Sequence, residues 1–341
     1  MKIFRRLIVV FLSLCIVSHA QYSGDVSNVA TTAAAFLEIG VGSRAIGMGG
    51  AFVATANDAS AMYWNPGGIA RLEKPELIFV HTEWIAEITF DYAGFVFPLP
   101  GIGSVGANIT TLNMGEMEVR TIDRQEGTGE FFDASDMAIG VSFATNLTDR
   151  FSIGFNAKYI MQRIWKEKSH GFAIDIGTLY NTGVEGLRLG AALTNFGTDM
   201  QMTGNDLLVY HDIDPTQLGN NERIFAQMET QSWPLPLNFQ FGIAMDLIQS
   251  GEHKFTIATD AVHPVDNTES VHLGGEYTFR DMFYIRAGYR NLFLRDSEEG
   301  LTAGGGFYTT QLGNFTIGID YAYANFGRLE NAQRFSVCLR F

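Results

Sequence analysis

The sequence lacks any uninterrupted apolar run after its first 20 positions that reaches about 18 residues, the length that a transmembrane helix needs. A helical membrane protein is therefore disfavoured. Charged residues make up only 18% of the 341 residues, whereas glycine occurs 37 times and aromatic residues reach 13%. This composition favours a twisted β-sheet with aromatic girdles over a highly charged soluble enzyme.

Positive charge and cysteine are also scarce. The formal net charge is −14 and no basic stripe is present to meet phosphates, so nucleic acid is disfavoured as a partner. If the N-terminal segment containing Cys15 is removed, Cys338 is the only cysteine left and no intrachain disulfide is possible. A lipoprotein signal at Cys15 fits poorly, because Leu14 stands where a small residue is expected.

Residues 1–20 have the features of a cleaved secretory signal peptide. Lys2, Arg5 and Arg6 precede an apolar core, and Ser18-His19-Ala20 provides a small-x-small cleavage site. Cleavage near Ala20 would remove these three basic residues and take the net charge from −14 to about −17.

Patterns that indicate catalysis or cofactor binding are missing as well. The seven histidines show no metal-ligand spacing and no G-x-S-x-G elbow occurs, so we expect no metal, no cofactor and no enzymatic activity. Gly40-x-Gly42-x-x-Ala45 matches a dinucleotide fingerprint in form, but the glycines after it would break the required helix. One acidic loop lacks calcium-loop spacing and is interpreted as solvated; it contains Asp206, Asp212, Asp214 and Glu222.

The C-terminal residues alternate between large apolar and polar or small side chains. Phe335, Val337, Leu339 and Phe341 share one face, which predicts a β-strand with one apolar side. A final strand of this kind is typical of bacterial outer-membrane barrels, where it pairs with the first strand and leaves no open edge in lipid.

The same alternation predicts fourteen strands, an even number as in single-chain bacterial barrels. We expect them at residues 77–84, 90–97, 103–113, 136–146, 150–161, 170–180, 186–196, 236–248, 253–262, 270–280, 282–291, 300–310, 313–324 and 332–341. Their apolar faces would contact lipid, and their other faces would line a polar lumen. The charged residues expected in that lumen are Asp175, Arg188, Asp246, Asp260, Glu276, Arg280, Arg286, Arg290, Asp320 and Arg340.

Loop lengths point the same way. If both termini are periplasmic, the periplasmic connections should be short, and they include 147–149 and 249–252. The opposite connections include the long segments 114–135 and 197–235, with one short exception at 85–89. The predicted fold class is therefore all-β: a transmembrane outer-membrane β-barrel of fourteen antiparallel strands.

Residues 21–75 differ from the barrel predicted at 76–341. Residues 21–35 are small, polar and without period, and the glycines of 36–72 suggest a compact segment where backbone approaches backbone closely. We expect a hatch folded against or inside the periplasmic end of the barrel. The residues of the hatch motif are Gly47, Gly49, Gly50, Asp58, Asn65, Pro66 and Gly67.

The run from Gly42 to Ala54, followed by Asp58 and by Trp64-Asn65-Pro66-Gly67-Gly68, resembles the N-terminal segment of the PorV/PorQ family, which is itself similar to FadL-type long-chain fatty-acid transporters. In that superfamily a barrel carries an N-terminal hatch with an Asn-Pro-Ala motif. Asn65 and Pro66 match this motif, and Gly67 replaces the alanine. The resemblance in plan covers nearly the whole mature chain, whereas motif identity is confined to residues 42–68.

The resemblance implies two different functions. PorV-like members serve type IX secretion, in which the barrel binds the C-terminal signal domains of exported proteins and helps to attach these proteins at the cell surface. FadL-like members instead pass hydrophobic small molecules through the barrel wall. The long outer loops favour the first function, with Tyr210, Phe225 and Trp233 as candidate protein-docking residues.

The same resemblance implies that the protein resides in the outer membrane after signal cleavage. Its expected partners are the lipid bilayer, other secretion-system proteins, exported cargo and the barrel assembly machinery.

Overall fold

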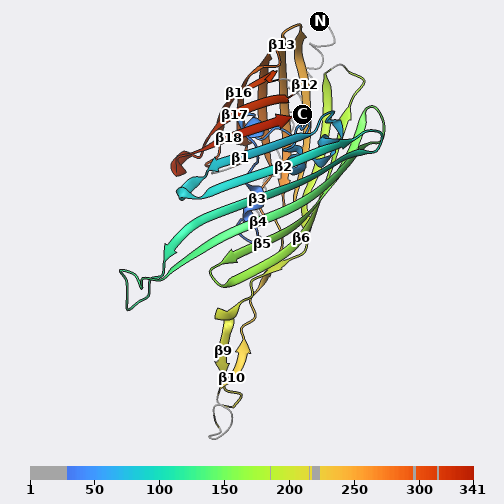
Figure 1. The fold of residues 1–341 in the computed structure, drawn as a ribbon. Coiled ribbons are helices and arrows are strands. Elements are labelled where there is room, and N and C mark those ends of the chain that lie inside the picture. The colour runs from blue at the N-terminus through green and yellow to red at the C-terminus, as the bar shows by residue number, and fades with distance from the viewer. Residues whose placement is uncertain (1–28, 185, 215, 217–222, 295–296, 313–314) are drawn as a thin grey trace.

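The computed structural model describes residues 29–184, 186–214, 216, 223–294, 297–312 and 315–341. The predicted signal peptide and the start of the lead-in lie outside these residues. Fourteen antiparallel strands form a closed barrel, which confirms the predicted fold class (Figure 1). Each strand pairs with its neighbours in sequence, except that β7 pairs with β12 across a long connection and β1 pairs with β18 to close the ring.

The barrel strands have the following bounds: β1 (Glu76–Glu83), β2 (Thr89–Leu99), β3 (Gly103–Glu118), β4 (Phe131–Asn146), β5 (Phe151–Ile164), β6 (Glu167–Asn181), β7 (Leu187–Gly197), β12 (Asn238–Ser250), β13 (His253–Pro264), β14 (Ser270–Phe279), β15 (Phe283–Leu292), β16 (Leu301–Leu312), β17 (Phe315–Asn325) and β18 (Asn331–Arg340).

The connections divide the barrel into two ends. Those at 100–102, 147–150, 251–252 and 280–282 are short and define the short-turn end, whereas 119–130, 198–237 and 293–300 lie at the opposite, long-loop end. Strands β3 and β4 extend to 16 residues each, so the predicted loop 114–135 shrinks to 119–130. Apolar alternation could not predict this extension, because strand residues outside the lipid need backbone hydrogen bonds to the next strand but no apolar face.

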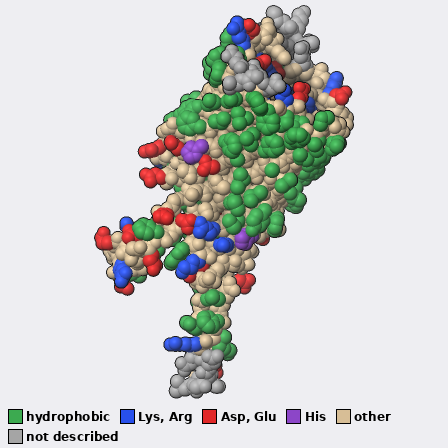
Figure 2. Space-filling view, in the orientation of Figure 1, with side chains coloured by type: hydrophobic (Ala, Val, Ile, Leu, Met, Phe, Trp, Pro, Cys, Tyr) green, Lys and Arg blue, Asp and Glu red, His purple; other side chains and the backbone are tan. Residues whose placement is uncertain are grey.

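The two faces of each strand separate as the alternation predicts. Outward-facing side chains include many large apolar residues that remain exposed, and in Figure 2 they cover much of the visible barrel face. Lumen-facing charges are buried, as Asp175, Asp260 and Arg286 illustrate. Arg280 is an exception to the prediction, because it lies in the exposed turn at 280–282, where it pairs with Glu252.

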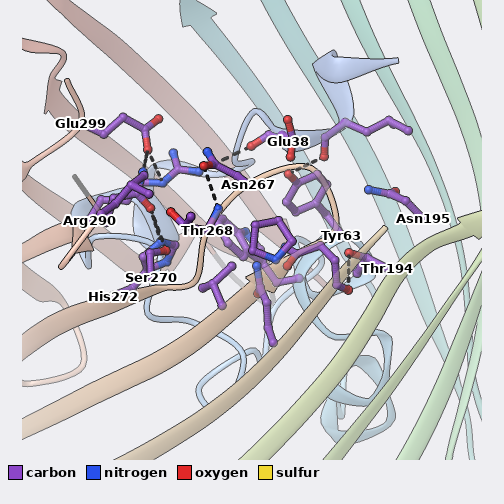
Figure 3. Close-up of a pocket in the computed structure, with 18 of the residues that line it drawn as sticks. Glu38, Tyr63, Thr194, Asn195, Asn267, Thr268, Ser270, His272, Arg290 and Glu299 are labelled. Carbon is purple, nitrogen blue, oxygen red and sulfur yellow. Dashed lines mark hydrogen bonds and ion pairs between the residues drawn. The ribbon is translucent and has the colours of Figure 1, made fainter. Parts of the chain in front are cut away.

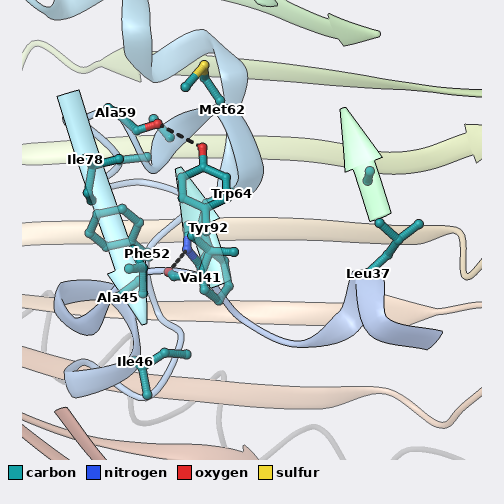
Figure 4. Close-up of a cluster of buried hydrophobic side chains, with 14 of the residues drawn as sticks. Leu37, Val41, Ala45, Ile46, Phe52, Ala59, Met62, Trp64, Ile78 and Tyr92 are labelled. Atoms are coloured by element: carbon teal, nitrogen blue, oxygen red, sulfur yellow. Dashed lines mark hydrogen bonds between the residues drawn. The ribbon is translucent and has the colours of Figure 1, made fainter. Parts of the chain in front are cut away.

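Residues 33–72, here called the hatch, lie inside the barrel (Figure 1). The hatch contains η1 (Ala35–Glu38), α2 (Ser43–Gly47), α3 (Ala61–Trp64) and η2 (Pro66–Arg71). Its side chains form a buried apolar cluster with inward residues of the wall, including Ile78 and Tyr92 (Figure 4). Among the described residues, no helix is both long and apolar enough to cross a membrane.

The hatch crosses the lumen from end to end, which corrects its predicted place at the periplasmic end alone. At the long-loop end, the Ala33 amide donates to the Pro234 carbonyl and the Thr32 hydroxyl donates to Asp266. At the short-turn end, the Arg71 guanidinium donates to the Arg150 carbonyl. The chain therefore enters the lumen beside the long loops and leaves it beside the short turns, where β1 begins.

The connection between β7 and β12 contains short strands that the sequence pattern did not predict. Strand β8 (Met200–Gln201) pairs with β11 (Ser232–Trp233), and β9 (Leu208–His211) pairs with β10 (Ile224–Gln227). The short helix η4 (Asn205–Leu207) joins the two ladders. The described residues of 198–237, here called the arm, project from the long-loop end, at the bottom of Figure 1.

Candidate functional site: the hatch and the arm

The glycines at the start of the hatch pack against strands β14 to β16. Gly49 has a φ of +66°, and a Cβ there would lie 2.7 Å from the Tyr289 amide nitrogen, so the position needs glycine for both conformation and space. Gly50 lies against the His272 ring, and Gly47 lies against Gly304 and Arg286. All three glycines predicted for the hatch motif therefore contact the same side of the wall, at β14 to β16.

Asn65, Pro66 and Gly67 contact the opposite wall, formed by β5 and β6. The Asn65 side-chain amide donates to the Val53 carbonyl at 2.8 Å and to the Thr178 carbonyl at 2.9 Å. Its oxygen accepts from the Gly67 amide at 3.1 Å. One fully buried side chain therefore joins two parts of the hatch to a barrel strand.

The barrel wall has its own glycines where the hatch touches it, and sequence reasoning missed them. At each of seven lumen-facing glycines, an added Cβ would lie at most 3.1 Å from a backbone atom of the hatch: Gly154, Gly177, Gly190, Gly242, Gly274, Gly288 and Gly304. A signal for them exists, since all fall on the lumen phase of their strands. We call this set the wall glycines.

Buried charges hold the hatch from the side of β13 to β17. Arg44 donates from Nε and Nη2 to the two oxygens of Glu276, at 2.9 and 3.0 Å, and forms an ion pair with Asp58 at 3.2 Å. Glu276 also binds Arg286 at 2.7 Å. Asp260 accepts hydrogen bonds from the Phe52 and Val53 amides at 2.8 and 2.9 Å. The predicted motif residue Asp58 therefore acts within the hatch, on Arg44 and on Ser60.

The hatch leaves a cavity of about 270 Å³ on its long-loop side (Figure 3). Glu38, Tyr63 and Trp64 line it from the hatch, and residues of β5, β7 and β12 to β15 line it from the wall. Water reaches Glu38, yet protein surrounds it on most sides, and this partial burial raises the pKa of Glu38 to about 7. The negative charges of Asp266 and Glu299 also raise this pKa, whereas the positive charge of Arg290 lowers it.

The base of the arm is fixed to the barrel. Lys168 and Thr203 exchange two backbone hydrogen bonds of 2.8 Å, and the Asp206 amide donates to Glu167 at 2.9 Å. Met200 is 2% exposed and packs over Gly171 of β6. The arm is therefore held at its base by the rim of β6 while its distal ladder stands clear.

The structure brings two of the three predicted docking residues together. Tyr210 and Phe225 are directly opposite each other in the β9–β10 ladder, with ring centroids 4.9 Å apart and exposed fractions of 64% and 69%. Trp233 lies at the base instead, opposite Met200, with 41% exposed. Leu208, Ile213 and Met228 add further exposed apolar surface to the arm.

The predicted closing strand, β18, pairs with β1 over eight residue positions and with β17 on its other side. Phe335, Val337 and Phe341 point outward and remain exposed, and Leu339 is half-buried on the same face. Phe341 stacks against Phe95 of β2, with ring centroids 6.4 Å apart. These residues complete the lipid-facing surface across the seam.

The chain matches the model of a known protein family. The family model described as "Type IX secretion system protein PorV" matches residues 22–203, more than half of the chain. No curated protein matches the sequence significantly.

Solved structures with a similar fold share little sequence identity with this chain. The CymD monoaromatic hydrocarbon channel has a TM-score of 0.56 and 13% identity, over 89% of this chain and 97% of that chain. The Ralstonia pickettii toluene transporter TbuX has a TM-score of 0.52 and 12% identity, over 88% and 97%. A Pseudomonas aeruginosa FadL homologue has a TM-score of 0.52 and 10% identity, over 88% and 98%.

Proposed function

The chain belongs to the PorV family of type IX secretion system proteins, and we propose that it binds exported proteins at the cell surface and helps to move or attach them there. Besides family membership, the arm is the observation that carries this proposal. Long loops of bacterial outer-membrane barrels face the exterior, so the arm would extend into the space where exported proteins arrive. The proposed role is binding, without a chemical step.

The surface of the arm suits protein contact. Tyr210 and Phe225 are large, adjacent and mostly exposed, and aromatic residues of this kind dominate the binding energy of many protein interfaces. Burying each ring beneath a partner would contribute roughly 1.5–3 kcal/mol. The barrel fixes the arm base, so the arm would lose less conformational freedom on binding than a free loop would.

The charge of the arm indicates what kind of partner surface would fit. Its described acidic residues are Asp199, Asp206, Asp212, Asp214 and Glu229, whereas Arg223 is its only described lysine or arginine. A partner surface that combines apolar side chains with positive charge would complement it. We propose that the C-terminal signal domain of an exported protein provides this surface.

The alternative is transport of long-chain fatty acids or other hydrophobic small molecules. The fold is shared with proteins described as hydrocarbon channels and toluene transporters. The lumen cavity weighs against that alternative, because the charged residues Glu38, Lys158 and Arg290 line it and a hydrocarbon offers charged groups no hydrogen bond. Protein binding is therefore the favoured function.

The deciding experiment replaces residues 205–229 with a short Gly-Ser linker and keeps the β8–β11 base. We expect exported proteins to disappear from the cell surface while the barrel stays in the outer membrane, as judged by mass spectrometry of surface proteins and by heat-modified gel mobility. The double variant Tyr210→Ser, Phe225→Ser should weaken binding of a purified signal domain about tenfold or more. Ile122→Ser is the matched control, because Ile122 is 92% exposed on the other long loop.

Two outcomes would contradict the proposal. If the linker variant displays exported proteins normally, the docking surface lies elsewhere. If deletion of the whole gene leaves secretion intact and abolishes fatty-acid uptake, the transporter function replaces the one proposed here.

A further inference from the structure

The cavity on the long-loop side of the hatch has two polar walls (Figure 3). On one side, Lys158 of β5 lies with Asn195 of β7. On the other, Arg290 and Asn291 of β15 lie with Glu299 of the connection between β15 and β16. Tyr63 and Trp64 of the hatch bring two aromatic rings to the same space. A volume of about 270 Å³ is enough for one long side chain or a small molecule.

Both cations of these walls already have carboxylate partners. Lys158 forms an ion pair with Asp175 at 2.8 Å and also donates to the Asn195 side chain. Arg290 forms an ion pair with Glu299 at 3.1 Å. Asn291 also donates to Glu299, at 2.6 Å. The cavity therefore has no positive charge left over for an anionic ligand.

The groups that keep free capacity are mostly acceptors. Within the described chain, the Glu38 carboxylate has neither an ion-pair partner nor a hydrogen-bond donor. The Asn238 side-chain oxygen is buried and has no partner among the described residues. The Gln240 amide, on a residue only 8% exposed, likewise makes no hydrogen bond in the described chain. A free carboxylate, a free amide oxygen and two aromatic side chains thus line one cavity, which is open to water at Glu38.

We propose that this cavity binds an organic cation, a primary ammonium or a guanidinium, with Glu38 as its counter-ion. Such a group supplies the hydrogen-bond donors that Glu38, Asn238 and Gln240 lack. The rings of Tyr63 and Trp64 are suited to cation–π contact with it. The cation can be a free amine or a lysine or arginine side chain of a peptide, and this assignment does not depend on the protein-binding role proposed for the arm.

Binding should strengthen as the pH rises through the titration of Glu38. The charged groups facing Glu38 are Asp266, Arg290 and Glu299; burial and the two carboxylates raise the pKa of Glu38 to about 7, against the effect of Arg290. Tyr63 also faces it and stays neutral, because burial raises the pKa of that phenol. Between pH 6 and pH 8 the ionised fraction of Glu38 rises about tenfold, and the affinity should rise in proportion.

The test uses isothermal titration calorimetry on the full-length protein in detergent micelles. The probes are N-acetyl-lysine methylamide, its arginine analogue, butylamine, and N-acetyl-norleucine methylamide as the uncharged control. We expect saturable binding of the cationic probes, little binding of the norleucine probe, and about tenfold weaker binding in Glu38→Gln. Glu73→Gln, which changes an exposed carboxylate at the short-turn end, is the matched control and should leave binding unchanged.

Butylamine binding as tightly as the lysine probe would assign the site to free amines, whereas much tighter binding of the lysine probe would assign it to peptide side chains. Equal binding of the lysine and norleucine probes would overturn the proposal. So would the absence of saturable binding for every cationic probe, or wild-type affinity in Glu38→Gln.

Discussion

The interface between hatch and wall and the surface of the arm use opposite chemistry. Inside the barrel, glycines face backbone, and buried side chains such as Asn65 and Asp260 satisfy hatch amides and carbonyls. On the arm, Tyr210 and Phe225 stand exposed and contact mainly each other. The first interface derives its stability from close approach of main chains, and the second keeps large apolar surface available.

This contrast separates two roles that substitutions can distinguish. A change at the wall should alter stability and the position of the hatch, and leave the affinity of the arm intact. A change on the arm should do the reverse, because its residues bury little surface in the protein alone.

The largest effect is expected at the wall glycines. In Gly274→Val, the added Cβ would lie 2.2 Å from the Met48 carbonyl oxygen, and a backbone atom cannot rotate away. We expect a loss of about 3 kcal/mol or more in the free energy of unfolding, measured by urea titration in detergent, together with faster hydrogen exchange in residues 45–55. Gly275→Val is the neighbouring control: its Cβ faces outward, and its nearest neighbour would be a Phe255 ring carbon at 3.6 Å. Equal losses in the two variants would remove the special role of the lumen face.

A smaller effect is expected for the double variant Asn65→Ala, Pro66→Ala. It removes three hydrogen bonds of a fully buried side chain and the fixed backbone angle that follows it. We expect a loss of roughly 2 kcal/mol and a rise in ion conductance across planar bilayers, while the barrel still assembles. The exposed Asn331→Ala serves as control. Unchanged conductance beside a sealed wild type would count against a gating role for these residues.

The smallest effect on stability is expected on the arm. Tyr210→Ser and Phe225→Ser should each change the free energy of unfolding by no more than about 0.5 kcal/mol, because both side chains are mostly exposed. Urea titration beside Gly274→Val measures this directly. A loss as large as that of the wall variant would show that the two rings stabilise the barrel itself, and would weaken the case for docking.

Local alternation was sufficient to predict the barrel but not its contents. A strand such as β18 shows its two faces within eight residues, and the even count and closing strand follow from such patterns. The lumen phase of the wall glycines could be read from the sequence, but their contact with the hatch could not, because a glycine on a lumen position looks the same whether it faces water or a hatch carbonyl. Pairs such as Arg44 and Glu276 are 232 residues apart in sequence, and only the closed ring brings them together.

The arm and the course of the hatch escaped prediction for a related reason. Ladders of two to four residues, such as β8 to β11, are too short to show a period. The hatch was expected against or inside the periplasmic end, whereas Thr32 and Ala33, where the chain enters the lumen, make hydrogen bonds to loops at the other end. Docking residues on the arm could still be proposed, because aromatic residues in a predicted long outer loop are candidate protein-contact residues.

The passage of the hatch through the whole lumen constrains the order of biogenesis. A ring that surrounds its own N-terminal segment must either close around that segment or have it threaded afterwards through a crowded interior. Glu76, the first residue of β1, accepts one hydrogen bond from the Ala59 amide of the hatch and one from Arg340 of the last strand. A single carboxylate therefore links the hatch to the junction between the first and last strands. If β1 pairs with β18 around a hatch that is already in place, both hydrogen bonds of Glu76 form in the same step. The barrel would then leave its assembly site with the hatch already inside.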